Sequence, residues 1–495
     1  MSSLETPERT RVFPVIGLEV HAQLQTRSKM FCPCPVTVGD AANSATCPIC
    51  LAFPGTLPVL NREAVTLAMR LALATGSEIH RDSRFSRKNY FYPDLPKGYQ
   101  ITQYDRPIAT GGGVEIDTPA GTRTIRLTRI HLEEDAGKSL HDTPFPDVPS
   151  TVSLVDWNRA GVPLCEIVSE PEVRTAEEAA SYLTELRRLL RFTGVSDADM
   201  EKGNLRCDAN VSVRLSENEP FGTRVEIKNL NSIRFVAKAI EHEIDRQAES
   251  LRRGERIVLE TRLWDEKASR TVPMRGKEEA QDYRYFPEPD LGALRIDDAW
   301  LAEAAGAIPE LPRARRARLM AAGIPDSDAE TLTSSRELAD YFEQTSSLAS
   351  PRLAANWVTG EVLRWMKERR ISPENALSFP VGPARLAGLL RLLDAGEIST
   401  ASGKEVLAAM VDSPAEAAAI VSEKGLGRIS DAGELDRVAA DIVGANPGQV
   451  VLYRSGKTAT FGWFVGQVMK RTAGRADPAQ VREALTRALS GAAEN

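Results

Sequence analysis

Acidic, amide and basic side chains alternate with apolar ones in three segments of the sequence, residues 16–24, 205–215 and 224–228. Because successive side chains of a β-strand point to opposite faces, each segment predicts a strand with one apolar and one polar face. The polar positions are Glu19, His21 and Gln23 in the first segment, Arg206, Asp208, Asn210, Ser212 and Arg214 in the second, and Arg224, Glu226 and Lys228 in the third.

The residue types on these polar faces favour a site that holds metal and phosphate. An antiparallel sheet often has one solvated face, so alternation alone requires no chemistry. Asp208 and Asn210, however, stand in the middle of a predicted strand, where Asp and Asn are depleted. Carboxylate oxygens are also ligands that Mg²⁺ prefers. Further candidates come from the intervening segments: Lys88, Asn89, Glu133, Glu134, Asp135, Glu166, Glu201 and Lys202.

Common phosphate-binding motifs do not account for such a site. The sequence has no GxxxxGK[ST] loop, since residues 137–139 (GKS) and 456–458 (GKT) lack the first glycine at the required distance. It also lacks the set of protein-kinase motifs. The residues therefore predict a Mg²⁺–nucleotide site of another kind, carried by a sheet.

Cysteines cluster near the N-terminus, in the pattern C-x-C-x12-C-x2-C formed by Cys32, Cys34, Cys47 and Cys50. In a reducing compartment such a set most often binds Zn²⁺, with an iron–sulfur cluster or unligated thiols as alternatives. Four thiolates complete a tetrahedral zinc site and leave no open position for a catalytic water. The predicted zinc is therefore structural.

The elements that would position these residues change in character along the chain. Residues 1–295 mix strand-like alternation with turns rich in Gly, Pro and Asn, whereas Ala, Leu, Arg and Glu recur at helical spacing from about Asp297. We therefore expect an α+β fold in which a β-rich part precedes all-helical material. A chain of 495 residues predicts two to four domains.

Two helices in the first part have clear end signals. Asn61 can cap an apolar periodic run that Gly76 ends. Thr175 and Glu178 have capping-box spacing ahead of a second run, which Gly194 ends.

The overall composition is that of a globular protein, with 42% hydrophobic and 26% charged residues. No apolar run approaches the ~18 residues of a membrane span. The short polar segment 1–11 lacks the apolar core of a signal peptide, so a cytoplasmic location is expected. The net charge of −7 argues against indiscriminate nucleic-acid binding, but an RNA can still bind to local basic patches.

Long motifs make the sequence recognisable. They are residues 15–21 (VIGLEVH), 87–100 (RKNYFYPDLPKGYQ), 131–138 (HLEEDAGK), 156–164 (DWNRAGVPL), 201–210 (EKGNLRCDAN), 222–231 (GTRVEIKNLN), 282–290 (DYRYFPEPD) and 461–470 (FGWFVGQVMK). Together they resemble the GatB family, the B subunits of GatCAB tRNA-dependent amidotransferases. The similarity runs from about Val12 to the end of the chain.

The resemblance implies an architecture and partners. It implies a β-rich cradle over residues 1–295, a helical domain over 296–405 and a small helical YqeY-like tail over 406–495. It also implies a heterotrimer with an amidase-type A subunit, which releases ammonia from glutamine, and a small C subunit. The chain itself lacks the serine- and glycine-rich amidase signature, so its ammonia must come from outside.

The resemblance further implies a reaction. Family members use ATP to phosphorylate the side-chain carboxylate of misacylated Glu-tRNA(Gln) or Asp-tRNA(Asn), and ammonia then displaces the phosphate. Phosphoryl transfer needs charge neutralisation and positioning more than a protein nucleophile, which agrees with the polar faces described above.

The resemblance also suggests roles for individual residues. Strand alternation leaves open whether Glu133 or Glu134 points into the site, and the resemblance favours Glu134. Lys88, Lys202 and Lys228 are expected to contact phosphate. The expected Mg²⁺ and ATP residues are Glu19, His21, Glu134, Glu166, Glu201, Asp208, Asn210 and Glu226, with Glu19, His21 and Glu134 as Mg²⁺ ligands.

We expect tRNA selection in the helical parts. Lys470, Arg471 and Arg475 surround Gly474 beside an aromatic helix segment, an arrangement suited to gripping a folded RNA, although such charges are also common on solvated helix faces. Two other functions stay open. One is a tRNA-docking scaffold with an inert sheet, and the other is an ATP-dependent ligase that acts alone. The absence of an ammonia-generating signature counts against the second.

Overall fold

The computed structural model describes residues 12–37, 39–140, 152–274, 283–429, 431–472 and 474–491. The polar segment 1–11 and the first residue of the motif at 282–290 lie outside these ranges. The chain divides into two compact units, Met1–Leu311 and Pro312–Asn495. In the described part of the chain, no helix is long and apolar enough to cross a membrane.

The first unit is built on a 13-stranded mixed sheet. Its main path runs β15-β14-β13-β12-β1-β11-β8-β5-β4-β16, while β6 and β7 pair with β8, and β2 pairs with β6. β13 and β14 are parallel. The strands are β1 (Phe13–Gln23), β2 (Glu78–Ile79), β4 (Ser86–Asn89), β5 (Tyr99–Thr102), β6 (Ala109–Thr110), β7 (Gly113–Thr118), β8 (Gly121–Glu134), β11 (Pro163–Ser169), β12 (Leu205–Arg214), β13 (Val225–Leu230), β14 (Glu260–Asp265), β15 (Arg270–Pro273) and β16 (Phe286–Pro287). Two small ribbons pair β3 (Asp82–Ser83) with β17 (Leu294–Arg295) and β9 (Lys138–Leu140) with β10 (Leu154–Asp156).

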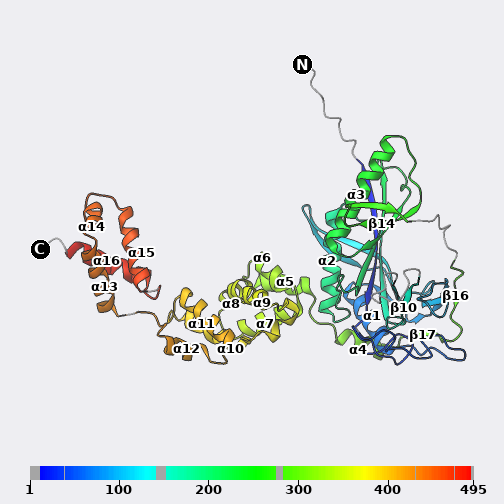
Figure 1. Ribbon diagram of the computed structural model, residues 1–495, viewed down its shortest axis with the longest axis horizontal. Coiled ribbons are helices and arrows are strands. Elements are labelled where there is room, and N and C mark those ends of the chain that lie inside the picture. Colours follow the sequence, from blue (N-terminus) through cyan, green and yellow to red (C-terminus); the bar gives the residue numbers. More distant parts are fainter. Residues whose placement is uncertain are drawn as a thin grey trace, which may run out of the picture. The chain divides into compact units, whose positions relative to one another are not determined.

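Three helices cover the apolar face of the sheet: α1 (Arg62–Ala74), α2 (Ala176–Phe192) and α3 (Ile233–Arg252). The last two lie side by side, and α3 contacts β12 (Figure 1). Leu18 and Val20 of β1 and Ala209 of β12 are fully buried in this core. The hydrophobic effect thus fixes one face of each strand, and the polar alternate positions point away from the helices.

The predicted ends of α1 and α2 are confirmed. Asn61 caps α1 by accepting hydrogen bonds from two backbone N–H groups of the first turn. Thr175 caps α2 by accepting from the backbone N–H of Glu178. Gly76 and Gly194 follow the two helices with φ angles of 66° and 65°, which L-residues with a side chain rarely adopt.

The helical material begins inside the first unit. α4 (Asp298–Gly306) contacts α1, and Ala304 joins the core of the sheet domain. The Trp300 indole nitrogen donates to the Thr66 hydroxyl at 2.8 Å. The first compact unit therefore extends beyond residue 295 to Leu311.

The described residues of the second unit form helices and connecting loops, which confirms the predicted α+β class with a helical C-terminal part (Figure 1). One apolar cluster runs from Leu319 to Ile420 and a second from Leu435 to Leu489. The helices are α5 (Pro312–Ala321), α6 (Asp326–Leu332), α7 (Arg336–Ser346), α8 (Pro351–Trp357), η1 (Val358–Val362), α9 (Leu363–Glu368), η2 (Pro373–Ser378), α10 (Pro383–Asp394), α11 (Thr400–Asp412), α12 (Ala417–Lys424), α13 (Ala432–Ala445), α14 (Pro447–Arg454), α15 (Ala459–Arg471) and α16 (Pro478–Gly491). α11 and α12 pack in the first cluster, so the boundary between the two apolar clusters lies after residue 420.

Candidate active site and cysteine cluster

A row of charged side chains crosses the polar face of the sheet. The register places His131 of β8 opposite Glu166 of β11, and Glu166 opposite His21 of β1. His21 in turn lies opposite Arg206 of β12. Adjacent strands therefore bring His21 beside residues that lie more than a hundred positions later in the sequence.

A β-bulge determines which residues of β8 join this row. The register between β8 and β11 shifts at Val168/Ser169. Leu127 faces the core before the shift, and Leu132 faces it afterwards. His131 and Glu133 consequently point to the polar face, as expected when one extra residue reverses the alternation.

Two carboxylates and two imidazoles meet at the centre of the row. His21 Nε2 lies 3.2 Å from Glu166 Oε2 and 3.4 Å from Glu133 Oε1. His131 Nε2 also lies 3.2 Å from Glu166 Oε2. His21, Glu133 and Glu166 each offer one ligand atom, and these atoms lie within 4.8 Å of one another. The group could hold a metal ion, and its carboxylates suit a hard cation.

Burial and mutual charge shift the pKa values of this group. Burial alone would lower the pKa of His21, but a hydrogen bond to Glu166 and the charge of Glu133 raise it to about 9. Burial alone would raise the pKa of Glu166, but His131 and His21 hold it well below the usual range. Burial, followed by the charges of Glu166 and Glu226, raises the pKa of Glu19.

The polar face continues from this group towards β13. Asn210 donates to the Glu19 carboxylate at 2.9 Å. Lys228 Nζ lies 2.9 Å from Asp208 and 3.0 Å from Glu226. The structure thus brings together Glu19, His21, Glu166, Asp208, Asn210, Glu226 and Lys228 on one face.

Four other predicted residues lie elsewhere. Glu134 points to the opposite face of β8, where it pairs with Lys97 and accepts a hydrogen bond from a backbone N–H. Glu201 and Lys202 are exposed on a turn before β12, and Lys202 pairs with Asp199. Lys88 lies at the far end of the sheet, on β4.

Sequence reasoning missed His131 and Arg129 as polar residues of this face, and strand alternation left the choice between Glu133 and Glu134 open. Glu133 takes the position next to His21 for which the resemblance favours Glu134, and His131 completes the row. Arg129, two positions before His131, has a buried Nε without a hydrogen-bond partner in the described part of the chain. The alternation of His131 and Glu133 with apolar residues could have indicated that both lie on a polar face. The β-bulge decides which face of the sheet that is, and it leaves no signal in the sequence.

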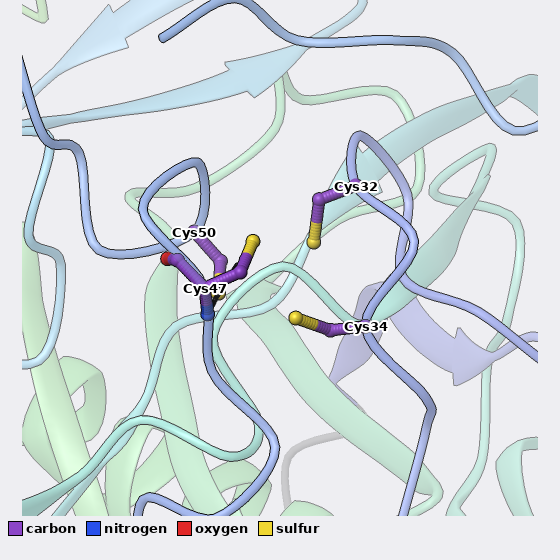
Figure 2. Close-up of side chains that lie close together, drawn as sticks. All are labelled: Cys32, Cys34, Cys47 and Cys50. Atoms are coloured by element: carbon purple, nitrogen blue, oxygen red, sulfur yellow. Dashed lines mark hydrogen bonds between the residues drawn. The ribbon is translucent and has the colours of Figure 1, made fainter.

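The cysteine group forms the second candidate site. Figure 2 shows the Cys32 and Cys34 thiols directed towards the loop that carries Cys47 and Cys50. The four sulfur atoms lie within 4.8 Å of one another, so the group could hold a metal ion. A hydrogen bond with Cys32 lowers the pKa of Cys50.

A buried lysine accompanies this group. The Lys29 side chain is fully buried, and its Nζ lies 3.7 Å from Cys50 Sγ and 3.2 Å from the Trp157 carbonyl oxygen. The lysine charge favours the thiolate form of Cys50, which is the form that binds metal.

Comparison with known proteins identifies the family. A model of the GatB/GatE catalytic domain matches residues 14–302, and a model of the GatB domain matches residues 340–489. The chain belongs to the GatB/GatE family. The expected resemblance to GatB proteins is thereby confirmed, and the catalytic-domain match spans the whole charged row.

Relatives in this family match over almost their entire length. A protein of Chlorobium phaeobacteroides is 52% identical over 479 residues, covering 96% of this chain and 99% of the relative. Proteins of Geobacter sulfurreducens and Myxococcus xanthus are both 50% identical, each over 96% of this chain and 99% and 98% of their own length. Each of the three is named as the B subunit of an aspartyl/glutamyl-tRNA(Asn/Gln) amidotransferase.

The raised pKa of His21 predicts a pH dependence of stability in buffer without added divalent cation. The unfolded imidazole titrates near 6.5 and the folded one near 9. Because the folded pKa is higher, the stabilisation is complete below pH 6.5 and is lost as pH rises towards 9. The melting temperature of the wild type should therefore fall more steeply over this window than that of His21→Gln.

A matched control is His242→Gln, because burial lowers the pKa of His242 and removes its titration from this window. This variant should keep the wild-type slope. Parallel melting curves for wild type and His21→Gln would contradict the assigned interaction.

Proposed function

We propose that the chain is the ATP-dependent B subunit of a tRNA-dependent amidotransferase. It would phosphorylate the side-chain carboxylate of misacylated Glu-tRNA(Gln) or Asp-tRNA(Asn), and amidation would give Gln-tRNA(Gln) or Asn-tRNA(Asn). The group formed by His21, Glu133 and Glu166 on the polar face carries the proposal, because its two carboxylates supply hard oxygen ligands where phosphate chemistry needs a cation. The names of the relatives support the choice of substrate.

The proposed reaction has two steps. A carboxylate oxygen of the misacylated amino acid forms a bond to the γ-phosphorus of ATP as the bond to ADP breaks. Ammonia then forms a bond to the carbonyl carbon, loses a proton and expels phosphate. Acyl phosphate formation supplies the leaving group that a carboxylate lacks.

The residues of the polar face have matching roles in this proposal. His21, Glu133 and Glu166 would hold Mg²⁺, which neutralises phosphate charge when bound. Glu19 and Asn210 would orient the nucleotide beside them, and Lys228 would contact phosphate. Burial lowers the pKa of Lys228, but Asp208 and Glu226 outweigh this effect and raise it, so the ammonium form is retained. Glu134, Glu201, Lys88 and Lys202 stay predictions as site residues.

A pocket at the end of the polar face that carries Glu19 offers room for the adenosine part of ATP. It adjoins Glu19 and Asn210 and is also lined by Gly17, Phe221 and Arg224. Phe221 is 59% exposed, so its ring can stack on a base. We place ATP here, with its phosphates directed along the face towards His21.

The proposal requires partners. Ammonia would come from an amidase-type A subunit, and a small C subunit would complete a heterotrimer. The word "subunit" in the names of the relatives supports a multisubunit enzyme. The complex would be a glutamine-hydrolysing carbon–nitrogen ligase of the cytoplasm.

Binding of the tRNA body is proposed for the C-terminal helices. Lys470 and Arg471 end α15 and are exposed, and no carboxylate pairs with them among the described residues. Arg475 follows and donates to the Gly425 carbonyl oxygen at 2.8 Å, which holds its loop in place. Exposed cations of this kind suit contacts to an RNA backbone.

The cysteine group is proposed to bind structural Zn²⁺. All its donors are sulfur, three of the four cysteines are buried, and Lys29 offsets part of the thiolate charge. A complete set of four thiolates suits tetrahedral zinc.

Removal of the charged row should abolish phosphorylation. In the complete complex, Glu19→Ala and His21→Ala should each lower tRNA-dependent ATP hydrolysis and amide formation by about 100-fold or more, because charge stabilisation is lost. Glutamine hydrolysis by the partner should remain measurable. Glu241→Ala on the exposed side of α3 is the matched control and should keep full activity.

Near-normal amidation by both variants at saturating Mg²⁺ would contradict this site. Amidation of tRNA by the wild-type complex without any ATP hydrolysis by this chain would favour the alternative function, a tRNA-docking scaffold with an inert sheet.

Metal analysis should find about one Zn²⁺ per chain. Cys47→Ser should lose it and lower the melting temperature, because metal binding contributes to folding stability. Cys165→Ala, in β11, should keep the zinc. A fully folded, active wild type without metal would remove the structural role.

Truncation after Gly427 should weaken tRNA binding. The cut lies between the two apolar clusters of the second unit, so the first cluster stays intact. The Michaelis constant for tRNA should rise by about tenfold or more at physiological salt, because the basic contacts are removed. As a control, the glutaminase activity of the partner should persist. An unchanged Michaelis constant for tRNA would refute the proposed binding of tRNA by the C-terminal helices.

A further inference from the structure

A row of tyrosines lies at the β4–β5 end of the first unit. The Tyr104 and Tyr285 rings are stacked face to face, with centroids 3.9 Å apart and planes 4° apart. Tyr283 meets Tyr285 at 6.1 Å and Tyr90 at 6.2 Å, and Tyr90 meets Tyr92 at 6.1 Å. These rings, called the tyrosine row below, form one continuous series.

The tyrosine row is held in place by the sheet. Asn89, the last residue of β4, donates from its backbone N–H to the Tyr283 carbonyl oxygen at 2.9 Å and from its side chain to the Arg284 carbonyl oxygen at 2.8 Å. β16, directly after Tyr285, pairs with β4. The rings are thus prearranged, which lowers the entropy cost of binding a flexible ligand.

The tyrosine row borders the charged row. Thr102 of β5 lies opposite Glu133, and Tyr104 follows two residues later. Burial, followed by Tyr283 and the carboxylates of Glu133 and Glu166, raises the pKa of Tyr285. A ligand stacked on these rings can therefore place an attached group at the carboxylates.

Two cations accompany the rings. Lys88 Nζ lies 4.8 Å from the Tyr283 ring centroid, and no carboxylate pairs with it among the described residues. Arg129 is close enough to influence Tyr285, and its buried Nε has no partner in the described structure. Aromatic faces beside unpaired cations are the elements of a site for single-stranded nucleic acid.

We propose that the tyrosine row binds the unpaired 3′ end of the aminoacylated tRNA. The terminal base stacks on the outer face of Tyr104, whose side chain is 48% exposed, and Lys88 and Arg129 neutralise backbone phosphates. The amino acid on the terminal ribose then reaches Glu133 and His21. This inference rests on the proposed function, which makes an acylated RNA the substrate.

The length of the tyrosine row favours RNA over ATP as its occupant. A single nucleotide uses one ring, whereas the row extends from Tyr104 to the half-exposed Tyr92. ATP also has a separate pocket at the other end of the charged row, beside Glu19 and Phe221. The two substrates would then meet over the carboxylates from opposite sides.

The test uses the complete heterotrimer and tRNA(Gln) or tRNA(Asn) with 2-aminopurine in place of the 3′-terminal adenine. Stacking on tyrosine quenches 2-aminopurine fluorescence, so binding to wild type and to Tyr104→Phe should quench it. Tyr104→Leu should bind without quenching and raise the Michaelis constant for acylated tRNA by about tenfold. Its Michaelis constant for ATP should not change.

Phe221→Ala is the matched control, because it removes an exposed ring from the pocket proposed for ATP. This variant should raise the Michaelis constant for ATP and should still quench the fluorescence of bound 2-aminopurine tRNA. The proposal would be overturned if quenching persisted in Tyr104→Leu. It would also be overturned if this variant raised the Michaelis constant for ATP instead of that for acylated tRNA. A wild type that binds and amidates tRNA without quenching would overturn it as well, an outcome that leaves the proposed function standing. A wild type that forms no amide with either tRNA refutes the proposed function itself.

Discussion

The antiparallel register of β1 with β11 and β12 is the constraint on which the rest of the cradle depends. It sets His21 between Glu166 and Arg206. A slip of one residue would turn His21 into the core and Val20 onto the polar face. The apolar side of the sheet prevents this, because Leu18 and Val20 are fully buried against the helices. Packing free energy on one face therefore fixes the position of charges on the other.

The same constraint explains how the cradle keeps buried charges at an acceptable cost. An isolated carboxylate or imidazolium in this environment would lose its ionisation. Here Glu166 lies between His21 and His131, and Lys228 lies between Asp208 and Glu226. Opposite charges are in contact within each of these two groups, so these charges are partly neutralised before a substrate arrives. Such a face can accept metal and triphosphate with little rearrangement, which is the main requirement of phosphoryl transfer.

Local signals in the sequence predicted much of the fold. Alternation identified β1 and β12, and the caps at Asn61 and Thr175 located α1 and α2, because these features depend on neighbours a few residues away. The bulge that turns Glu133 rather than Glu134 towards His21 depends on pairing between β8 and β11. The exposure of Glu201 likewise depends on where the chain turns before β12. The tyrosine row joins residues almost two hundred positions apart, so only the folded chain reveals it.

In the proposed reaction, the cradle activates a side-chain carboxylate as an acyl phosphate. Transfer of oxygen from that carboxylate to inorganic phosphate would be the direct evidence of this step. Glu-tRNA(Gln) with both side-chain carboxylate oxygens replaced by ¹⁸O would be amidated by the complete heterotrimer with ATP and glutamine. The released phosphate would then be analysed by mass spectrometry. If an acyl phosphate forms, each phosphate released with amide formation should carry one ¹⁸O atom. Amide formation that releases only unlabelled phosphate would contradict this step.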